Sequence, residues 1–153
     1  MQIDFNLPER FNLSYVNSND EEEVPVLIHR AIFGSMERFI GILIEHYAGN
    51  FPFWLSPTQA IIVPISEKHF DYGRDFLNDL KSAGIRAELD DRNEKVGKKI
   101  RDAELNKVPY MFVVGDREMS SLSVSVRHRD DGDRGSILKD ELIEQLKKEG
   151  NVN

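Results

Sequence analysis

The second part of the chain, from residue 58 onward, alternates between strand-like and helix-like patterns. Continuous apolar runs and two-residue alternation predict strands over 60–65, 85–89, 110–114 and 122–126. Apolar positions at helical spacing predict helices over 67–83, over 97–106 and from a capping Ser136 onward. Polar segments predict loops at 90–96, 116–121 and 130–135. The order βαβαββα predicts an α/β domain with a mostly parallel sheet flanked by helices. With one added strand beyond these four, we expect a mixed, mostly parallel five-stranded sheet.

The first part of the chain predicts an antiparallel β-hairpin followed by a helix. Residues 11–16 alternate, a polar and acidic turn follows, and a second strand is expected over 24–28. After Gly34, Ser35 is suited to cap a helix. The apolar stripe of this helix is Met36, Phe39, Ile40, Leu43, Ile44 and Tyr47.

A rigid connector separates the two patterns. Residues 51–57 contain three aromatic side chains and two prolines, and the change of pattern follows directly. We therefore expect two parts, residues 1–57 and residues 58–153.

Composition limits the possible classes of protein. The chain has no cysteine, which excludes a disulfide framework and fits a reducing cytoplasm. No apolar run reaches the roughly 18–20 residues of a membrane helix. The net charge of −7 argues against indiscriminate nucleic-acid binding, DNA included. Residues 58–153 hold 17 Lys and Arg against 19 Asp and Glu, so a local basic surface remains possible there.

The residues alone leave the chemistry open. His29 lies in a predicted strand and fits either a metal ligand or a half-buried histidine. Arg38, at the start of the helix, fits a phosphate contact or a surface ion pair. Ligands of open α/β sheets gather at the carboxyl ends of strands, which points to the loops that contain Asn93 and Glu118. By default these two residues and Arg127 are solvated polar side chains. The cluster Lys95, Lys98, Lys99 and Arg101 fits a solvated face or a phosphate-contacting face.

Several sequence motifs together carry a resemblance that covers nearly the whole chain. They include the peptide from His29 to Phe39, Trp54-Leu55-Ser56-Pro57, Asp91-Arg92-Asn93-Glu94-Lys95, Gly115-Asp116-Arg117-Glu118 and Val124-Ser125-Val126-Arg127. With these motifs the chain resembles the bacterial-type threonyl-tRNA synthetases, which are class II aminoacyl-tRNA synthetases. The resemblance implies that residues 1–57 are the tail of a catalytic domain and residues 58–153 an anticodon-binding domain.

The resemblance also implies roles for individual residues. His29 matches one of three protein ligands of a catalytic zinc, and Arg38 matches the arginine that contacts the phosphates of ATP-Mg. Gln2 falls near the amino-acid pocket, which is a weaker match. Asn93, Glu118 and Arg127 match positions that contact the anticodon of threonine tRNA, and such groups suit the edges of splayed RNA bases.

The chain departs from the family in what it lacks. The first two class II motifs, the editing domain and the other two zinc ligands are absent, and one ligand cannot hold zinc. We expect a fragment that keeps anticodon recognition, lacks catalysis and binds neither zinc nor ATP-Mg by itself, from a homodimeric parent enzyme. The alternatives are a stand-alone accessory or regulatory RNA-binding protein and an unrelated nucleotide-binding α/β protein.

Overall fold

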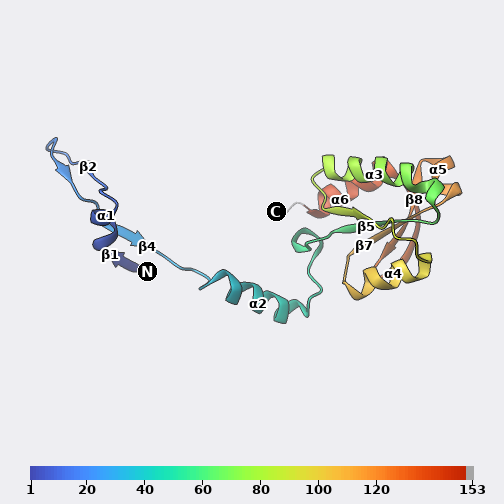
Figure 1. The fold of residues 1–153 in the computed structure, drawn as a ribbon, viewed down its shortest axis with the longest axis horizontal. Coiled ribbons are helices and arrows are strands. Elements are labelled where there is room, and N and C mark those ends of the chain that lie inside the picture. Colours follow the sequence, from blue (N-terminus) through green and yellow to red (C-terminus); the bar gives the residue numbers. More distant parts are fainter. Residues whose placement is uncertain (151–153) are drawn as a thin grey trace. The chain divides into compact units, whose positions relative to one another are not determined.

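The computed structural model describes residues 1–150, which form two compact units, Met1–Glu45 and the part that begins at His46 (Figure 1). Each unit is described by itself. The boundary predicted after Pro57 lies further along the chain and stays a prediction. None of the helices in residues 1–150 has the length and apolar character needed to span a bilayer.

Short strands and one long helix make up the first unit. Its elements are β1 (Gln2–Asp4), α1 (Asn6–Arg10), β2 (Tyr15–Val16), β3 (Glu22–Glu23), β4 (Leu27–His29) and α2 (Met36–Tyr47), whose last residues lie in the second unit. The strands β2 and β3 form an antiparallel hairpin as predicted, but its second strand is Glu22–Glu23. The strand predicted over 24–28 is observed as β4, which pairs antiparallel with β1 instead of closing the hairpin. Ser35 caps α2 as predicted, because its Oγ accepts a hydrogen bond from the backbone N–H of Arg38 at 3.2 Å.

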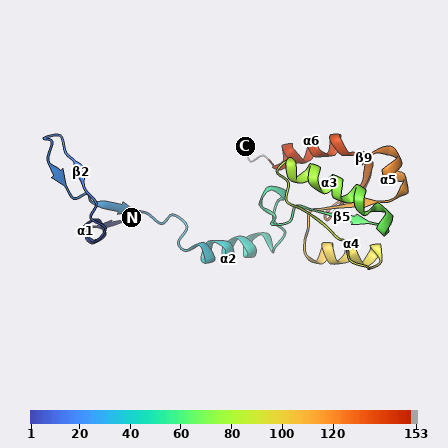
Figure 2. The same ribbon diagram turned by 45° about the horizontal axis from the view of Figure 1, so that its top comes forward.

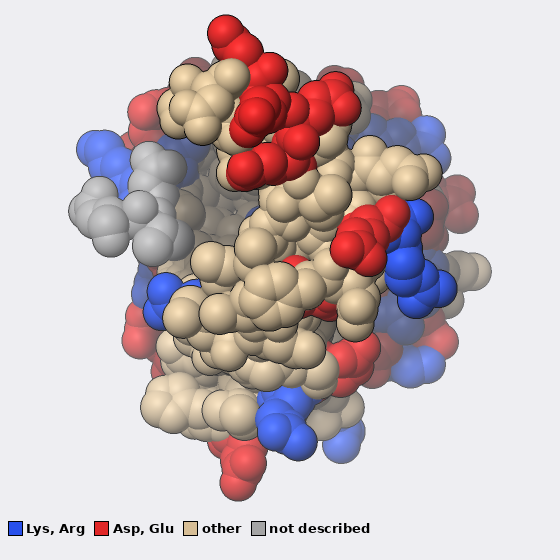
Figure 3. All heavy atoms as spheres, turned by 90° about the vertical axis from the view of Figure 1, so that its left-hand side faces the viewer, with Lys and Arg blue, Asp and Glu red and all other residues tan. Residues whose placement is uncertain are grey.

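The first unit exposes much of its apolar surface. The helix α2 has no buried residue at all. The face shown in Figure 3 is largely uncharged, and acidic side chains gather at one end of it. The exposed large apolar side chains include Ile3, Phe5, Phe11, Val16, Ile28, Ile32, Phe33, Met36 and Ile42. Apolar surface of this extent is typical of interaction surfaces.

The second unit contains one five-stranded sheet flanked by helices, which confirms the predicted fold class. Its elements are a short 3-10 turn η1 (Phe53–Leu55), β5 (Ala60–Pro64), η2 (Glu67–His69), α3 (Phe70–Ser82), β6 (Ala87–Leu89), α4 (Val96–Leu105), β7 (Tyr110–Val114), α5 (Asp116–Ser121), β8 (Ser123–His128), β9 (Gly132–Leu138) and α6 (Lys139–Gly150). The strand order is β6-β5-β7-β8-β9. The strands β6, β5 and β7 are parallel, and β8 and β9 continue the sheet antiparallel.

Helices cover the two faces of this sheet unequally. In Figure 2, α3 and α6 lie on one side of the sheet and α4 lies on the other. The larger core forms under α3 and α6 and contains Phe76, Phe112 and Leu142. The smaller core, which contains Ala103 and Met111, forms under α4 next to β5 and β7. The α4 side of β8 carries the polar side chains of Ser123, Ser125 and Arg127, as expected for a half-solvated antiparallel strand.

Two segments differ from the sequence prediction. Residues 116–121, predicted as a loop, form the short helix α5, because the Glu118 side chain accepts a hydrogen bond from the N–H of Gly115 and closes the first turn. Residues 130–135, also predicted as a loop, lie largely in β9, which is the fifth strand of the sheet. Pairing with β8 continues through Ser136 to Leu138, so α6 begins at Lys139 instead of after Ser136.

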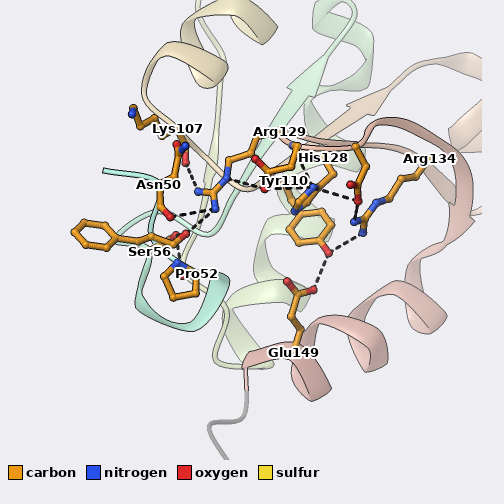
Figure 4. A network of polar contacts seen from close by, with 12 residues as sticks. Asn50, Pro52, Ser56, Lys107, Tyr110, His128, Arg129, Arg134 and Glu149 are labelled. Atoms are coloured by element: carbon orange, nitrogen blue, oxygen red, sulfur yellow. Dashed lines mark hydrogen bonds and ion pairs between the residues drawn. The ribbon is translucent and has the colours of Figure 1, made fainter. Parts of the chain in front are cut away.

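Two arginines and a glutamine fasten the connector to the second unit. Arg129, whose side chain is 12% exposed, donates to the carbonyl oxygens of Phe51 at 2.8 Å and Lys107 at 3.0 Å (Figure 4). Arg86 donates to the carbonyls of Trp54 at 2.7 Å and Ser56 at 2.8 Å. The buried Gln59 amide adds a bond to the carbonyl of Phe53. The connector therefore has a fixed path along this unit.

Candidate nucleic-acid interface

Three parallel strands end at one edge of the sheet, and two of the predicted site residues follow them. The register pairs Ile62 with both Leu89 and Phe112, so the carboxyl ends of β6, β5 and β7 lie together. Asn93 lies in the loop after β6, and Glu118 lies in α5 directly after β7. The structure therefore places both residues beyond the same edge of the sheet, as the sequence predicted.

Arg127 lies further back on the sheet. It pairs in register with Met111, three residues before the end of β7, which corresponds to about 10 Å along the strand. The same pairing puts its side chain on the side of Met111, which is the α4 side, where α4 packs against β5 and β7. Strands β6 and β8 are three spacings apart, about 14 Å. The three residues thus suit different nucleotides of one RNA segment.

These side chains are largely free to bind a ligand. Within residues 1–150, the side chains of Asn93 and Arg127 make no hydrogen bond or ion pair, and Glu118 uses only one carboxylate oxygen, Oε2, to cap α5 at 3.0 Å. The described part of the chain gives Oε1 no partner. An exposed amide, a half-used carboxylate and an arginine offer donors and acceptors for base edges, sugars and phosphates.

Glycine is needed in front of Glu118. A Cβ atom added to Gly115 would lie 2.6 Å from Cδ1 of Ile65 and 3.1 Å from Oε2 of Glu118. The side-chain end of Ile65 can move, but the carboxylate is held by the N–H of Gly115 itself. The absence of a side chain at this position therefore lets Glu118 fold back onto the end of β7.

A buried histidine ties α5 to the turn after β5. His69, 2% exposed, directs Nε2 to Oδ1 of Asp116 at 3.2 Å, and its Nδ1 accepts a hydrogen bond from the N–H of Ser66 at 3.1 Å. Lys68 also donates to Asp116, and this hydrogen bond is the largest cause of the lowered pKa of the Asp116 carboxyl. The contacts fix the start of α5, and with it the position of Glu118.

A second charged cluster lies under the loop of Asn93. Asp90 is buried and accepts hydrogen bonds from Arg92, which keep the pKa of the Asp90 carboxyl below its usual 3.8 against the opposing effect of burial. Lys99, from the predicted basic cluster, is also buried here and cannot contact a phosphate. Lys98 pairs with Glu94. Lys99 lies four residues before Ala103, on the apolar side of α4. This spacing could have indicated its burial from the sequence.

The first unit brings two further predicted residues together. Gln2 and His29 face each other in the register of β1 and β4, and both are exposed. Arg38 is exposed in the first turn of α2. No group of three metal-binding side chains occurs in residues 1–150, so the residues present do not fit a zinc site by themselves.

Two family models match separate parts of the chain. A model described as "Anticodon binding domain" matches residues 59–149. A model described as "tRNA synthetase class II core domain (G, H, P, S and T)" matches residues 1–47.

Two proteins that are similar to this chain over nearly its whole length are both threonine–tRNA ligases. A threonine–tRNA ligase of Natranaerobius thermophilus is 55% identical over 149 residues, which is 97% of this chain and 23% of the relative. A threonine–tRNA ligase of Clostridioides difficile is 56% identical over 149 residues, with the same shares. The chain thus spans less than a quarter of the length of the relatives it matches.

Two solved structures are similar as well. The crystal structure of the RNA binding domain of threonyl-tRNA synthetase from Cryptosporidium parvum Iowa II matches with a TM-score of 0.76 at 38% identity, over 99% of this chain and 39% of that chain. A prolyl-tRNA synthetase from Cryptosporidium parvum, complexed with halofuginone and AMPPNP, matches with a TM-score of 0.63 at 25% identity, over 94% of this chain and 31% of that chain.

Proposed function

This chain belongs to the family of anticodon-binding domains, and on that premise we propose that its residues 58–153 bind the anticodon stem-loop of threonine tRNA. The homologues of the chain are threonine–tRNA ligases, which supports threonine tRNA as the ligand. In this proposal Asn93, Glu118 and Arg127 contact bases of the loop. The observation that carries it is Arg127, a half-buried arginine on the sheet face where α4 packs against β5 and β7, with no side-chain partner in residues 1–150.

The expected binding is weak, salt-sensitive and dependent on Arg127. A chain with net charge −7 can make few phosphate contacts, so its affinity should be modest. Each contact that forms releases counterions, so the affinity should fall as the salt concentration rises. Arg127→Ala should raise the Kd about 30-fold, since a well-placed arginine contact contributes about 2 kcal/mol. Fluorescence anisotropy with a labelled anticodon stem-loop of threonine tRNA, at several salt concentrations, measures both effects.

Arg74→Ala is the matched control for this measurement. Arg74 is exposed on α3, which lies on the opposite side of the sheet, and its replacement removes the same charge. We expect less than about a twofold change in Kd, because the charge is remote and screened. If Arg127→Ala binds the stem-loop as tightly as the parent chain, the assignment of Arg127 is wrong.

We further propose that the chain belongs to an ATP-dependent threonine–tRNA ligase of the cytoplasm, homodimeric as the resemblance implies. In that enzyme Arg38 would contact the ATP phosphates, His29 would supply one zinc ligand and Gln2 would lie near the amino-acid pocket. The match of residues 1–47 to a class II core domain supports this part of the proposal.

By itself the chain is expected to be inactive in threonine activation. One histidine and one arginine do not form a metal site or a triphosphate site. The chain alone therefore lacks the groups that would stabilise the transition state of threonine activation. Threonine-dependent exchange of pyrophosphate into ATP should stay at background, even when the chain is present at micromolar concentration. A threonine-dependent signal from purified chain would contradict this, and alanine replacing Arg38 would then test whether the signal comes from this chain.

A further inference from the structure

The loop between β6 and α4 is held in place by a buried carboxylate at its first residue. The Asp90 side chain is 3% exposed. Its Oδ2 accepts a hydrogen bond from Nη2 of Arg92 at 2.6 Å, and its Oδ1 accepts one from Nε at 2.9 Å and one from the backbone N–H of Arg92 at 3.2 Å. The Arg92 Nη1 continues to Asp102 of α4 at 2.9 Å. One guanidinium therefore joins the start of the loop to the helix that follows it.

A buried lysine supports the same residue from below. The Lys99 side chain is 3% exposed, and its Nζ donates to the carbonyl oxygen of Asp90 at 2.8 Å and lies 3.9 Å from Oδ1. The backbone N–H of Asp90 also donates to the carbonyl of Ile62 in β5 at 2.9 Å. Burying a charged pair costs about as much as it returns, and an apolar pair of similar size is often as stable. The net effect of Lys99 is thus to fix the conformation of the loop more than to add stability.

Asn93 lies at the centre of this loop between two restrained neighbours. Arg92 is bound to Asp90 and Asp102, and Glu94 is bound to Lys98. The backbone N–H of Glu94 donates to the carbonyl of Arg92 at 2.9 Å. The side chain of Asn93 is exposed and has no hydrogen bond in residues 1–150. The loop thus presents a single amide to solvent on a fixed backbone.

We propose that Asp90, Arg92 and Lys99 are positioning residues that hold Asn93 in the orientation in which its amide recognises an RNA base. The inference rests on the proposed binding of an anticodon loop. A loop that is already ordered does not lose conformational freedom on binding, so its contact contributes more to affinity. A fixed amide also discriminates between bases, because a base whose edge does not match leaves the donor or acceptor of the amide without a hydrogen-bond partner. The three residues therefore control base selectivity at one position of the anticodon.

The test is a double-mutant cycle between Lys99→Met and Asn93→Ala. Lys99→Met keeps the Asp90–Arg92 pair and replaces the buried ammonium with an apolar group of similar length. We expect a modestly lower Tm, because the buried carbonyl of Asp90 loses its donor. We also expect a Kd for the stem-loop raised about tenfold, and loss of discrimination at the same anticodon base that Asn93→Ala affects. The variant with both changes should bind no more weakly than Asn93→Ala alone. Lys81→Met, an exposed lysine of α3, is the control for the charge change and should leave the Kd within about twofold.

The outcomes separate this inference from the proposed function. If the two changes add independently, or if Lys99→Met leaves discrimination intact, the positioning role is wrong and the RNA-binding proposal stands. If the parent chain does not bind the stem-loop, both are wrong. Should Lys99→Met fail to fold, Arg92→Gln replaces it in the cycle, because the Arg92 side chain is half exposed and its loss leaves the Lys99–Asp90 contact in place. The same lack of additivity with Asn93→Ala is then expected.

Discussion

Replacing Arg129 with alanine is expected to lower the free energy of unfolding of the second unit by about 3 kcal/mol. The guanidinium donates to the carbonyls of Phe51 and Lys107, and more weakly to that of Asn50 at 3.5 Å. With its side chain 12% exposed, few water molecules reach these groups. Alanine leaves the carbonyls without a charged donor and opens a cavity under the connector.

Chemical denaturation followed by intrinsic fluorescence measures this loss, since Trp54 lies in the connector. Limited proteolysis with chymotrypsin gives a second measure, because the connector offers two aromatic cleavage sites, Phe53 and Trp54, that should be cut faster in the variant. Arg117→Ala is the control, as Arg117 is exposed and its side chain has no partner in the described residues. A change below about 0.5 kcal/mol for Arg129→Ala would show that Arg86 and Gln59 suffice to fix the connector.

Between pH 10 and 12 the parent chain is expected to lose about 2–3 kcal/mol of stability through Tyr110 alone. Burial is the largest cause that raises the pKa of the Tyr110 phenol from 10.0 to about 12, and the hydrogen bond to Glu149 adds to it. Tyr110 is 4% exposed and donates to Glu149 at 2.7 Å. Below pH 10 the phenol is protonated in both states, so the contribution is complete. As the pH rises from 10 to about 12, the unfolded chain loses this proton while the folded chain keeps it, and stability falls.

Tyr110→Phe removes this titration. Free energies of unfolding of both chains, measured at intervals from pH 8 to 12, should converge and cross near about pH 11, because all other groups titrate in both and only the parent loses the Tyr110 contribution. At pH 12 the variant should be the more stable chain by about 1–2 kcal/mol. At pH 8 the variant should be about 1 kcal/mol less stable, since Arg134 and Glu149 lose a shared hydroxyl but reach solvent. Tyr72→Phe is a useful comparison, because the pKa of Tyr72 is also raised by burial. Parallel curves for the parent and Tyr110→Phe would contradict the assignment.

The elements that the sequence predicted are those with strong apolar periodicity. The continuous run at 110–114 and the stripe of Phe76 and Leu80 identify β7 and α3, because all of these side chains except that of Val113 are buried. The helix α5 escaped prediction because polar contacts, from Glu118 to the N–H of Gly115 and from Asp116 to Lys68, define it. Such polar contacts leave no hydrophobic pattern in the sequence from which the helix could be predicted.

The strand β9 escaped prediction for a different reason. Its sequence contains two glycines and two charged residues, which by themselves favour a loop. The neighbouring β8 supplies the backbone partners, and tertiary pairing overrides the weak local preference. Arg134, the extra residue of the irregularity opposite Val126 and Arg127, contacts Tyr110 from this strand.

The position of the candidate site was predictable from the sequence, but the buried contacts that hold its loops in place were not. Strand ends marked the loops of Asn93 and Glu118, because the carboxyl ends of parallel strands meet at one edge. The buried Asp90–Lys99 pair was not predictable as a contact, since neither residue type is usually buried and their meeting depends on how α4 packs. The roles of Asn93, Glu118 and Arg127 stay predictions until the binding experiments are done.

The separation of Phe51 and Arg129 by 78 residues has a consequence for the order of folding. The hairpin of β8 and β9 closes through a connection of three residues, so it pairs early. The strand β5 pairs with the central strand β7, fifty residues later, and loop closure over that distance is slow. During synthesis the aromatic connector therefore leaves the ribosome long before the arginine that secures it, and remains exposed to chaperones and proteases for that interval.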